Sequence, residues 1–356
     1  MKKVNIAVVG LGSIARTHIA SLRALPAVRP LAVQPVLHTL VTRRPAEVAA
    51  EAIAMGFAAV TDSLEGALSG TDVDVVDICT PNALHREAAM AALARGKAVY
   101  CEKPLASNLA DAEAMAAAAA AASTVTQVAL VYRYHPVAMR LKALLEMGAI
   151  GQLLQFRATY NHSGYLNPTA NKGWRSRSEL SGGGGLLDLG VHVVDLLQLL
   201  AGPLRLEHAD TRTLVRHRLP GAGAPPQEVD VDDWALLHVV THAGVPGTVE
   251  TSRIALGSEC FRLEFYGTGG SVVCDLGRDA EPQVRRFAPE PLPVPGHPAL
   301  QYLPPSRLTL GPFVDAHQAG LYHFLLRFVG EDPTPGWAPD FTAALTAERI
   351  IYEALA

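Results

Sequence analysis

The sequence predicts two successive folds: an α/β domain with a doubly wound parallel sheet, then an α+β domain with a mostly antiparallel open sheet. Two observations predict this arrangement. In the first third, short runs rich in β-branched residues alternate with helical stretches, which is the pattern of βαβ units. From about residue 151, longer runs alternate apolar with polar residues between Gly and Pro turns, as strands with one covered face do.

The elements of the first region follow from the spacing of its apolar residues. Seven consecutive alanines begin at Ala116, and we expect a helix there because alanine is the best helix former and Ser107 and Asn108 precede the stretch as caps. The expected strands are 4–9, 37–42, 73–79, 98–101 and 125–132, and the expected helices are 13–25, 46–55, 84–95 and 111–122.

The second region ends in two amphipathic helices, which we expect over 313–329 and 341–354, around a turn-rich segment at 330–333. The domain boundaries that follow are 1–133, 134–312 and a closing helical segment over 313–356. The expected strands of the second region are 153–160, 204–216, 234–241, 247–254, 261–266 and 271–275.

Composition limits the classes of partner. The chain has 356 residues, of which 49% are hydrophobic and 18% charged, so it can bury about two cores. Its net charge of −4 does not suit a nucleic-acid backbone. The first apolar run breaks at Gly10 and Gly12, too early for a signal peptide or a span of about 20 residues. We therefore expect a cytoplasmic protein with no nucleic-acid and no membrane partner.

Cysteine and histidine spacing predicts no metal site. The four cysteines contain no Cys-x-x-Cys pair, which favours free thiols in a reducing compartment. His238 and His242 lie in a strand-like apolar run, where a structural or surface histidine is commoner than a zinc ligand.

A glycine-rich turn follows the first expected strand. Gly10, Gly12, Ser13 and Ile14 belong to a Gly-x-Gly-x-x-Ala segment that opens a helix, the context that the dinucleotide-binding fingerprint requires. Small residues let the backbone approach a pyrophosphate, whose charge the helix N-terminus stabilises. The first domain is thus predicted to be a Rossmann domain that binds a dinucleotide.

The end of the second strand selects the cofactor in this fold. Thr42, Arg43 and Arg44 stand there, and no acidic residue follows until Glu47. Two guanidinium groups beside a hydroxyl suit the 2′-phosphate of NADP, so NADP is favoured over NAD. The alternative is a solvated basic helix entry, because arginines at strand ends are often merely exposed.

Three further motifs follow in order. Cys79-Thr80-Pro81-Asn82-Ala83-Leu84-His85 closes one strand, and Cys101-Glu102-Lys103-Pro104 closes the next. Gly173-Trp174-Arg175 precedes a four-glycine run and the segment Leu187-Asp188-Leu189-Gly190-Val191-His192. Together with the glycine-rich turn, these motifs resemble the glucose-fructose oxidoreductase / myo-inositol dehydrogenase (Gfo/Idh/MocA) family over nearly the whole chain.

The resemblance implies which residues meet the cofactor and the reacting carbon. It implies that the segment around Thr80, Pro81, Asn82 and His85 lines the nicotinamide-ribose side of the cleft. It implies that Glu102 and Lys103 form the Glu-Lys-Pro signature, with the lysine directed at the reacting carbon. Taken singly, Lys103 could equally be a surface lysine at a strand end.

The second half of the site is expected on a helix. Asp188 and His192 are four residues apart, so on a helix they share one face and can meet one substrate hydroxyl. His192 could instead be a core histidine bonded to Asp188. A dinucleotide fingerprint, a strand-end lysine and this pair supply different parts of a hydride-transfer site, which favours the functional interpretation.

The loop before the glycine run supplies polar and aromatic side chains, which suit a polyhydroxylated ring. An ordinary surface loop is the alternative for each of them. The expected substrate residues are Tyr165, Trp174 and Arg175, with Asp188 and His192, and Asn161 and His162 lie nearby.

One departure from the family pattern stands at Val131, where an asparagine is usual. A polar contact to the nicotinamide or the substrate is therefore lost or relocated. Arg133, two residues on, is expected to be structural, at the domain junction.

The resemblance implies an NAD(P)-dependent oxidoreductase that moves a hydride between the cofactor and a secondary alcohol of a sugar, inositol or related polyol. His192 would be the acid/base oriented by Asp188, and Lys103 would polarise the oxygen or relay its proton; alternatively Asp188 binds the substrate directly. Two other functions stay open: an NAD-dependent glycosidase of the same fold, and a non-catalytic dinucleotide-binding sensor.

We also expect a homo-oligomer, a dimer or a tetramer. The second domain binds the substrate and would make the oligomer contact. Its sheet has one face for helices, and apolar positions such as Leu236, Val249 and Phe265 are expected on the other face, where they need burial.

Overall fold

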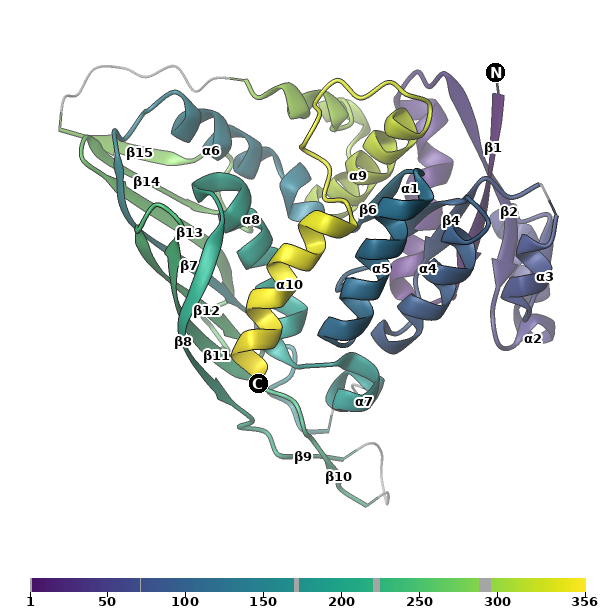
Figure 1. The fold of residues 1–356 in the computed structure, drawn as a ribbon, viewed down its shortest axis with the longest axis horizontal. Coiled ribbons are helices and arrows are strands. Elements are labelled where there is room, and N and C mark those ends of the chain that lie inside the picture. Colours follow the sequence, from purple (N-terminus) through teal and green to yellow (C-terminus); the bar gives the residue numbers. More distant parts are fainter. Residues whose placement is uncertain (1, 71, 170–172, 220–224, 288–295) are drawn as a thin grey trace. The chain divides into compact units, whose positions relative to one another are not determined.

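The computed structural model describes residues 2–70, 72–169, 173–219, 225–287 and 296–356, which form two compact units (Figure 1). The first unit comprises Met1–Tyr134 with Gln301–Leu345, and the second comprises His135–Leu300 with Thr346–Ala356. The chain therefore returns to its first unit near residue 301, whereas the sequence placed the start of a separate closing segment at 313. The physical reason is that the helix after residue 311 packs against the first helix of the chain.

The first unit is built on a parallel sheet whose strand order among the described residues is β3-β2-β1-β4-β5-β6. The order reverses between β1 and β4, so the carboxyl ends of these two strands flank the crevice where a Rossmann sheet binds its ligand. The strands are β1 Lys2–Val9, β2 Val33–Val41, β3 Ala59–Thr61, β4 Val75–Ile78, β5 Ala98–Cys101 and β6 Thr126–Val128.

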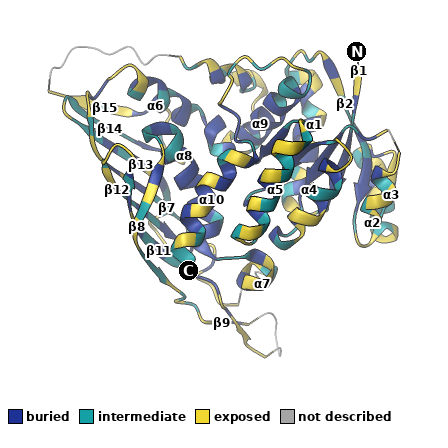
Figure 2. Ribbon diagram, viewed as in Figure 1, coloured by how far each residue is buried: buried dark blue, intermediate teal, exposed yellow. Residues whose placement is uncertain are grey.

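Helices cover this sheet, and Figure 2 shows exposed stripes along α4 and α5. Asn108 caps α5, since its side chain accepts the backbone N–H of Asp111 at 2.9 Å, as expected. The helices are α1 Ser13–Val28, α2 Pro45–Met55, α3 Leu64–Leu68, α4 His85–Leu93, α5 Leu109–Ala122 and α9 Pro312–Phe328, with short turns η1 Asn82–Leu84 and η2 Val131–Tyr134.

The expected strand over 125–132 is wrong in its second half. The strand β6 ends at Val128, whose N–H donates to Pro339 O at 2.8 Å. The next residues turn into η2, which places Val131 in the core and lets Arg133 donate to Trp337 O at 3.0 Å. Contacts with residues 337–339 decide this turn, and its local sequence carries no sign of them.

The second unit is built on a mixed sheet of order β15-β14-β13-β7-β12-β11-β8. Within this sheet, the β7–β12 pair is parallel, and the other pairs that the structure describes are antiparallel. The strands are β7 Leu153–Asn161, β8 Leu204–Arg212, β11 Trp234–Thr241, β12 Pro246–Ser252, β13 Cys260–Gly267, β14 Gly270–Asp275 and β15 Gln283–Arg286, and β9 His217–Arg218 pairs with β10 Gln227–Glu228.

Helices lie on one face of this sheet (Figure 1). They are α6 Pro136–Glu146, which the sequence did not predict, α7 Ser178–Ser181, the π-helical turn η4 Leu186–Gly190, α8 Val191–Ala201 and the second half of α10 Phe341–Leu355. The stretch Ser178–Ala201 has the length of a membrane span and contains an 18-residue window with a mean hydropathy of 1.4, but 78% of that window is buried within the protein, as in a core helix.

The strand register corrects the assignment of apolar residues to the open face. Val249 pairs with Leu237, while Leu236 pairs with Glu250, so Leu236 and Val249 lie on opposite faces. Val249 and Phe265 are fully buried in the core, where the ring of Phe265 stacks on that of Phe156 at 6.2 Å. The expected need to cover them by another subunit is therefore wrong, and of the three only Leu236 faces outward.

Candidate cofactor and substrate sites

The loop after β1 has the geometry of a phosphate-binding turn. Gly10 has φ +96°, and a Cβ on it would lie 2.8 Å from the carbonyl oxygen of Cys79, so a larger residue does not fit. Gly12 begins α1 with no side-chain cap, and a Cβ on it would meet nothing within 4 Å. Ser13 is exposed and Ile14 half-buried in the first turn. Free N–H groups at a helix start beside open space fit a pyrophosphate.

The turn after β2 carries the residues expected to select the cofactor. The N–H of Thr42 donates to Thr61 O at 2.9 Å, which extends the pairing of β2 with β3. Arg43 is exposed, and Arg44 stands at the start of α2, where its guanidinium pairs with Glu47 at 3.2 Å. Both arginines thus lie at the strand end where the ribose of a dinucleotide arrives, but the charge of Arg44 is shared with a carboxylate.

The segment after β4 is held by His85. This buried ring approaches Thr80 O and Pro104 O, each at 2.9 Å, and so joins the loops that follow β4 and β5. Burial lowers the pKa of His85, which favours a neutral ring. Both ring nitrogens of His85 therefore face backbone carbonyls of the protein. A direct contact of His85 with the cofactor stays a prediction.

The rest of this segment leads into the η1 turn, which starts at Asn82 after Thr80 and Pro81. The hydroxyl of Thr80 is buried and has no hydrogen-bond partner among the residues that the structure describes. A buried polar atom of this kind is costly unless a ligand or water satisfies it. This hydroxyl, like the open space at Gly12, fits a cofactor bound along the strand ends.

Lys103 follows β5, next to β4 in the sheet, and its peptide bond to Pro104 is cis. The preceding Glu102 is buried, and its Oε2 accepts the backbone N–H of Lys103 at 3.1 Å. Its Oε1 lies 3.0 Å from Nε2 of His18. Although burial opposes ionisation, the hydrogen bond to His18 and the charges of His18 and Lys103 lower the pKa of Glu102 to about 2. Glu102 is thus an anion with both oxygens bonded inside the protein.

Metal-binding residue types occur in this cluster. His18, Asp77 and Cys79 form one group of potential ligands, and His18, Glu102 and His317 form another. The imidazole of His18 lies 3.0 Å from each carboxylate, which is the length of a hydrogen bond. Hydrogen bonding therefore accounts for the arrangement.

In the second unit, Asp188 and His192 lie on successive turns of one helical segment. Asp188 is half-buried within the π-helical turn η4, and His192 is buried in the first turn of α8. A single π turn inside a helix often marks a functional site, and the sequence did not predict it. That the two side chains share one face and meet one substrate hydroxyl stays a prediction.

The helix start is fixed by a residue that the sequence analysis missed. The carboxylate of Asp232 accepts the N–H groups of Gly184 at 2.8 Å and Leu186 at 2.7 Å. A Cβ on Gly184 would lie 1.9 Å from the backbone oxygen of Asp232, so only glycine fits there. Burial raises the pKa of Asp232, and the two N–H donors oppose that rise. Asp232 therefore positions the turn from which Asp188 follows.

The expected substrate residues before this helix have different surroundings. The ring of Tyr165 is buried between two guanidinium groups, that of Arg253 at 4.1 Å and that of Arg218 at 5.4 Å. Tyr165 is thus part of the packing of the unit. Trp174 and the exposed Arg175 lie in the η3 turn Gly173–Ser176 and stack on each other at 4.4 Å. Their contact with a substrate stays a prediction.

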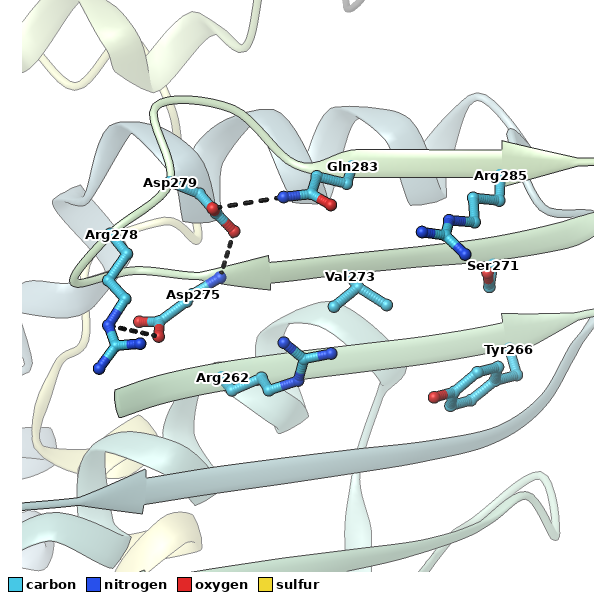
Figure 3. Close-up of a pocket in the computed structure, with 9 residues that line it drawn as sticks. All are labelled: Arg262, Tyr266, Ser271, Val273, Asp275, Arg278, Asp279, Gln283 and Arg285. Atoms are coloured by element: carbon cyan, nitrogen blue, oxygen red, sulfur yellow. Dashed lines mark hydrogen bonds and ion pairs between the residues drawn. The ribbon is translucent and has the colours of Figure 1, made fainter. Parts of the chain in front are cut away.

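A separate hollow lies on the sheet of the second unit, across β13, β14 and β15 (Figure 3). Its volume is about 360 Å³, and none of the expected site residues lines it. Some of its polar groups bind one another, since Arg278 pairs with Asp275 at 3.7 Å and Gln283 bonds Asp279 at 3.4 Å. The hollow is therefore a polar surface apart from the expected site residues.

Comparison with known proteins identifies both units. Residues 4–130 match the oxidoreductase family with an NAD-binding Rossmann fold, and residues 138–273 match the GFO/IDH/MocA C-terminal domain. A levoglucosan dehydrogenase from Pseudarthrobacter phenanthrenivorans is 31% identical to this chain. The alignment covers 99% of this chain and 97% of that protein.

Solved structures agree over the same length. Levoglucosan dehydrogenase in complex with NADH and levoglucosan has a TM-score of 0.88 at 30% identity, covering 99% of this chain and 98% of that one. An NAD-binding oxidoreductase from Klebsiella pneumoniae has a TM-score of 0.87 at 31% identity, covering 98% and 95%. These matches and the two domain profiles place the chain in the Gfo/Idh/MocA family as an NAD(P)-dependent oxidoreductase.

Proposed function

We propose that the protein oxidises a secondary alcohol of a cyclic sugar or polyol, and that an anhydrosugar of the levoglucosan type is the first substrate to try. The observation that carries the proposal is the position of Lys103. It follows β5 at the carboxyl edge of the sheet, one strand beyond the β1–β4 switch point where a dinucleotide binds. The likeness to levoglucosan dehydrogenase supports the substrate class.

The reaction needs a hydride acceptor, a proton acceptor and a group that stabilises the developing alkoxide. The nicotinamide, when bound, accepts the hydride from the carbinol carbon. In our proposal the hydroxyl proton leaves to His192 while the ammonium of Lys103 stabilises the oxygen; alternatively, the neutral amine of Lys103 accepts the proton and then carries the stabilising charge. Asp188 either orients His192 or binds a substrate hydroxyl.

The test is a screen of NAD+ and NADP+ reduction with levoglucosan, aldoses, inositols and sugar lactones. We expect turnover with at least one cyclic sugar or polyol, measured as formation of reduced cofactor. Tightly retained cofactor with no net reduction, but with release of a free sugar from a glycoside, would instead indicate a glycosidase. Cofactor binding without turnover on any substrate would indicate a sensor.

The cofactor preference is a second proposal. Arg43 and Arg44 predict a preference for NADP(H), whereas the NADH complexes of the similar levoglucosan dehydrogenase favour NAD(H). Because Arg44 is paired with Glu47, Arg43 is the guanidinium that would meet a 2′-phosphate. If NADP(H) is preferred, Arg43→Ala should raise the Kd of NADP+ at least about tenfold and leave that of NAD+ nearly unchanged. Equal effects on both cofactors would refute the preference.

Oligomerisation is a third proposal. The outward face of the second unit's sheet carries Leu236 together with charged and polar side chains, among them Glu250 and Arg262. We propose that this face meets a second copy of the chain. Light scattering at micromolar concentration should give a multiple of 37.7 kDa, and a mass of 37.7 kDa itself would refute the proposal.

A further inference from the structure

We propose that His18 is a positioning residue for Lys103: its imidazole joins α1 to Asp77 and Glu102, and Glu102 in turn holds the backbone N–H of Lys103. The inference rests on the proposed function only for the chemical role of Lys103. The contacts of His18 come from α1, β4 and the segment after β5, so one side chain ties the phosphate-binding helix to two strand ends of the sheet.

The geometry requires a ring that donates from both nitrogens. Nδ1 of His18 lies 3.0 and 3.1 Å from the two oxygens of Asp77, and Nε2 lies 3.0 Å from Oε1 of Glu102. An ionised carboxylate only accepts hydrogen bonds, so a neutral imidazole, with one N–H, would leave one contact without a proton. The side chain of His18 is fully buried, away from bulk water.

The described side chains that pack against His18 add no further charge to the cluster. Tyr100 packs on His18 edge to face at 5.4 Å, His317 lies 5.2 Å away, and Cys79 Sγ lies 3.3 Å from Nδ1. Burial raises the pKa of Tyr100, raises that of Cys79 to about 12 and lowers that of His317 to about 3. These three groups are neutral near pH 7, so the charges are those of His18, Asp77, Glu102 and Lys103.

Although burial opposes ionisation, the charge of Asp77 and the hydrogen bonds of Asp77 and Cys79 raise the pKa of His18 well above its ordinary value. The cluster of one imidazolium and two carboxylates therefore has a net charge of −1, and Lys103 follows directly in the chain. Both oxygens of Glu102 are bonded within the protein, so Glu102 acts on the reaction through Lys103. The negative charge of the cluster should hold the amine of Lys103 in its protonated form.

The test compares Glu102→Gln, His18→Gln and the double variant His18→Gln/Asp77→Asn in the full chain. The amine pKa of Lys103 is measured by competitive acetylation over a range of pH, with mass spectrometry of the Lys103 peptide and Lys97 as the internal reference. Glu102→Gln removes one negative charge and should lower that pKa by about 0.5 to 1 unit. His18→Gln removes the positive charge and should raise that pKa, whereas the double variant removes one charge of each sign and should leave it nearly unchanged.

Stability provides the second readout. His18→Gln leaves two buried carboxylates facing each other, and we expect the Tm at neutral pH to fall by about 6–12 °C. The added Asp77→Asn removes one of these charges and should restore at least half of that loss. Glu87→Gln, an exposed change on α4, is the control for both measurements and should move neither.

An unchanged Lys103 pKa in Glu102→Gln would overturn the proposal, as would a double variant no more stable than His18→Gln. Neither readout needs turnover or bound cofactor. If both give the expected result while Lys103→Ala keeps full turnover, the positioning by His18 stands and the proposed function of Lys103 fails.

Discussion

Two glycines, one in each unit, show two different reasons for the same residue type. Gly184 lies where a Cβ would be 1.9 Å from the backbone oxygen of Asp232, whereas a Cβ on Gly12 would meet nothing within 4 Å. The fold of the second unit itself requires the first glycine. At the second glycine, the space that the fold leaves open fits the cofactor. Gly184 thus allows a close backbone contact that fixes a helix start, whereas Gly12 leaves room for a ligand.

The largest effect is expected at Gly184. Gly184→Ala forces a methyl group into backbone atoms of Asp232, which cannot move without breaking the bonds from Asp232 to Gly184 and Leu186. We expect a loss of at least about 3 kcal/mol in the free energy of unfolding, measured with urea. Gly12→Ala is the matched control. A Gly184→Ala protein as stable as the wild type would mean that this close approach does not constrain the fold.

The next effect concerns chemistry. Lys103→Ala and His192→Asn should each lower kcat by ~10²-fold or more, the usual contribution of a positioned acid/base. The half-buried Lys103 should change the Tm by only a few degrees, and the buried His192 by more. Lys97→Ala is the control. Near-wild-type turnover in both variants would show that neither side chain is catalytic.

The third effect is expected at Asp232, whose carboxylate accepts two backbone N–H groups of the helix start. Asp232→Asn replaces one of two acceptors by a donor, so one N–H of Gly184 or Leu186 loses its bond. We expect about 1–3 kcal/mol of lost stability and a fall in kcat larger than the change in KM. The control is Asp230→Asn, whose exposed carboxylate binds Ser178. Equal losses in both variants would show that the Asp232 bonds are not special.

The smallest effect on stability is expected at Gly12, where the difference between the regions is tested directly. Gly12→Ala should change the free energy of unfolding by less than about 1 kcal/mol, because nothing surrounds the new methyl group. It should raise the Kd for NADH by about tenfold or more, measured by fluorescence titration, because the methyl group takes space beside the helix N-terminus. An unchanged Kd would place the pyrophosphate elsewhere.

The fold class, the glycine-rich turn after β1 and the order of the motifs could all be predicted from the sequence alone. These signals are local: the glycine spacing at Gly10 and Gly12 follows a strand and opens a helix, and Asp188 and His192 are four residues apart on one helix. Short-range periodicity and turn chemistry are enough to predict such features. The assignments of Lys103, Asp188 and His192 to catalysis remain predictions for the experiments above.

The hydrogen bonds that hold these residues in place became visible in the tertiary structure alone. His18 meets Asp77 across 59 residues and Glu102 across 84, and Asp232 caps a helix start 48 residues before it. Strand register placed Val249 in the core, and contacts with residues near 337 ended β6 early. The physical reason is that a hydrogen bond between distant segments depends on how the strands align. No local pattern of apolar or polar residues encodes that alignment.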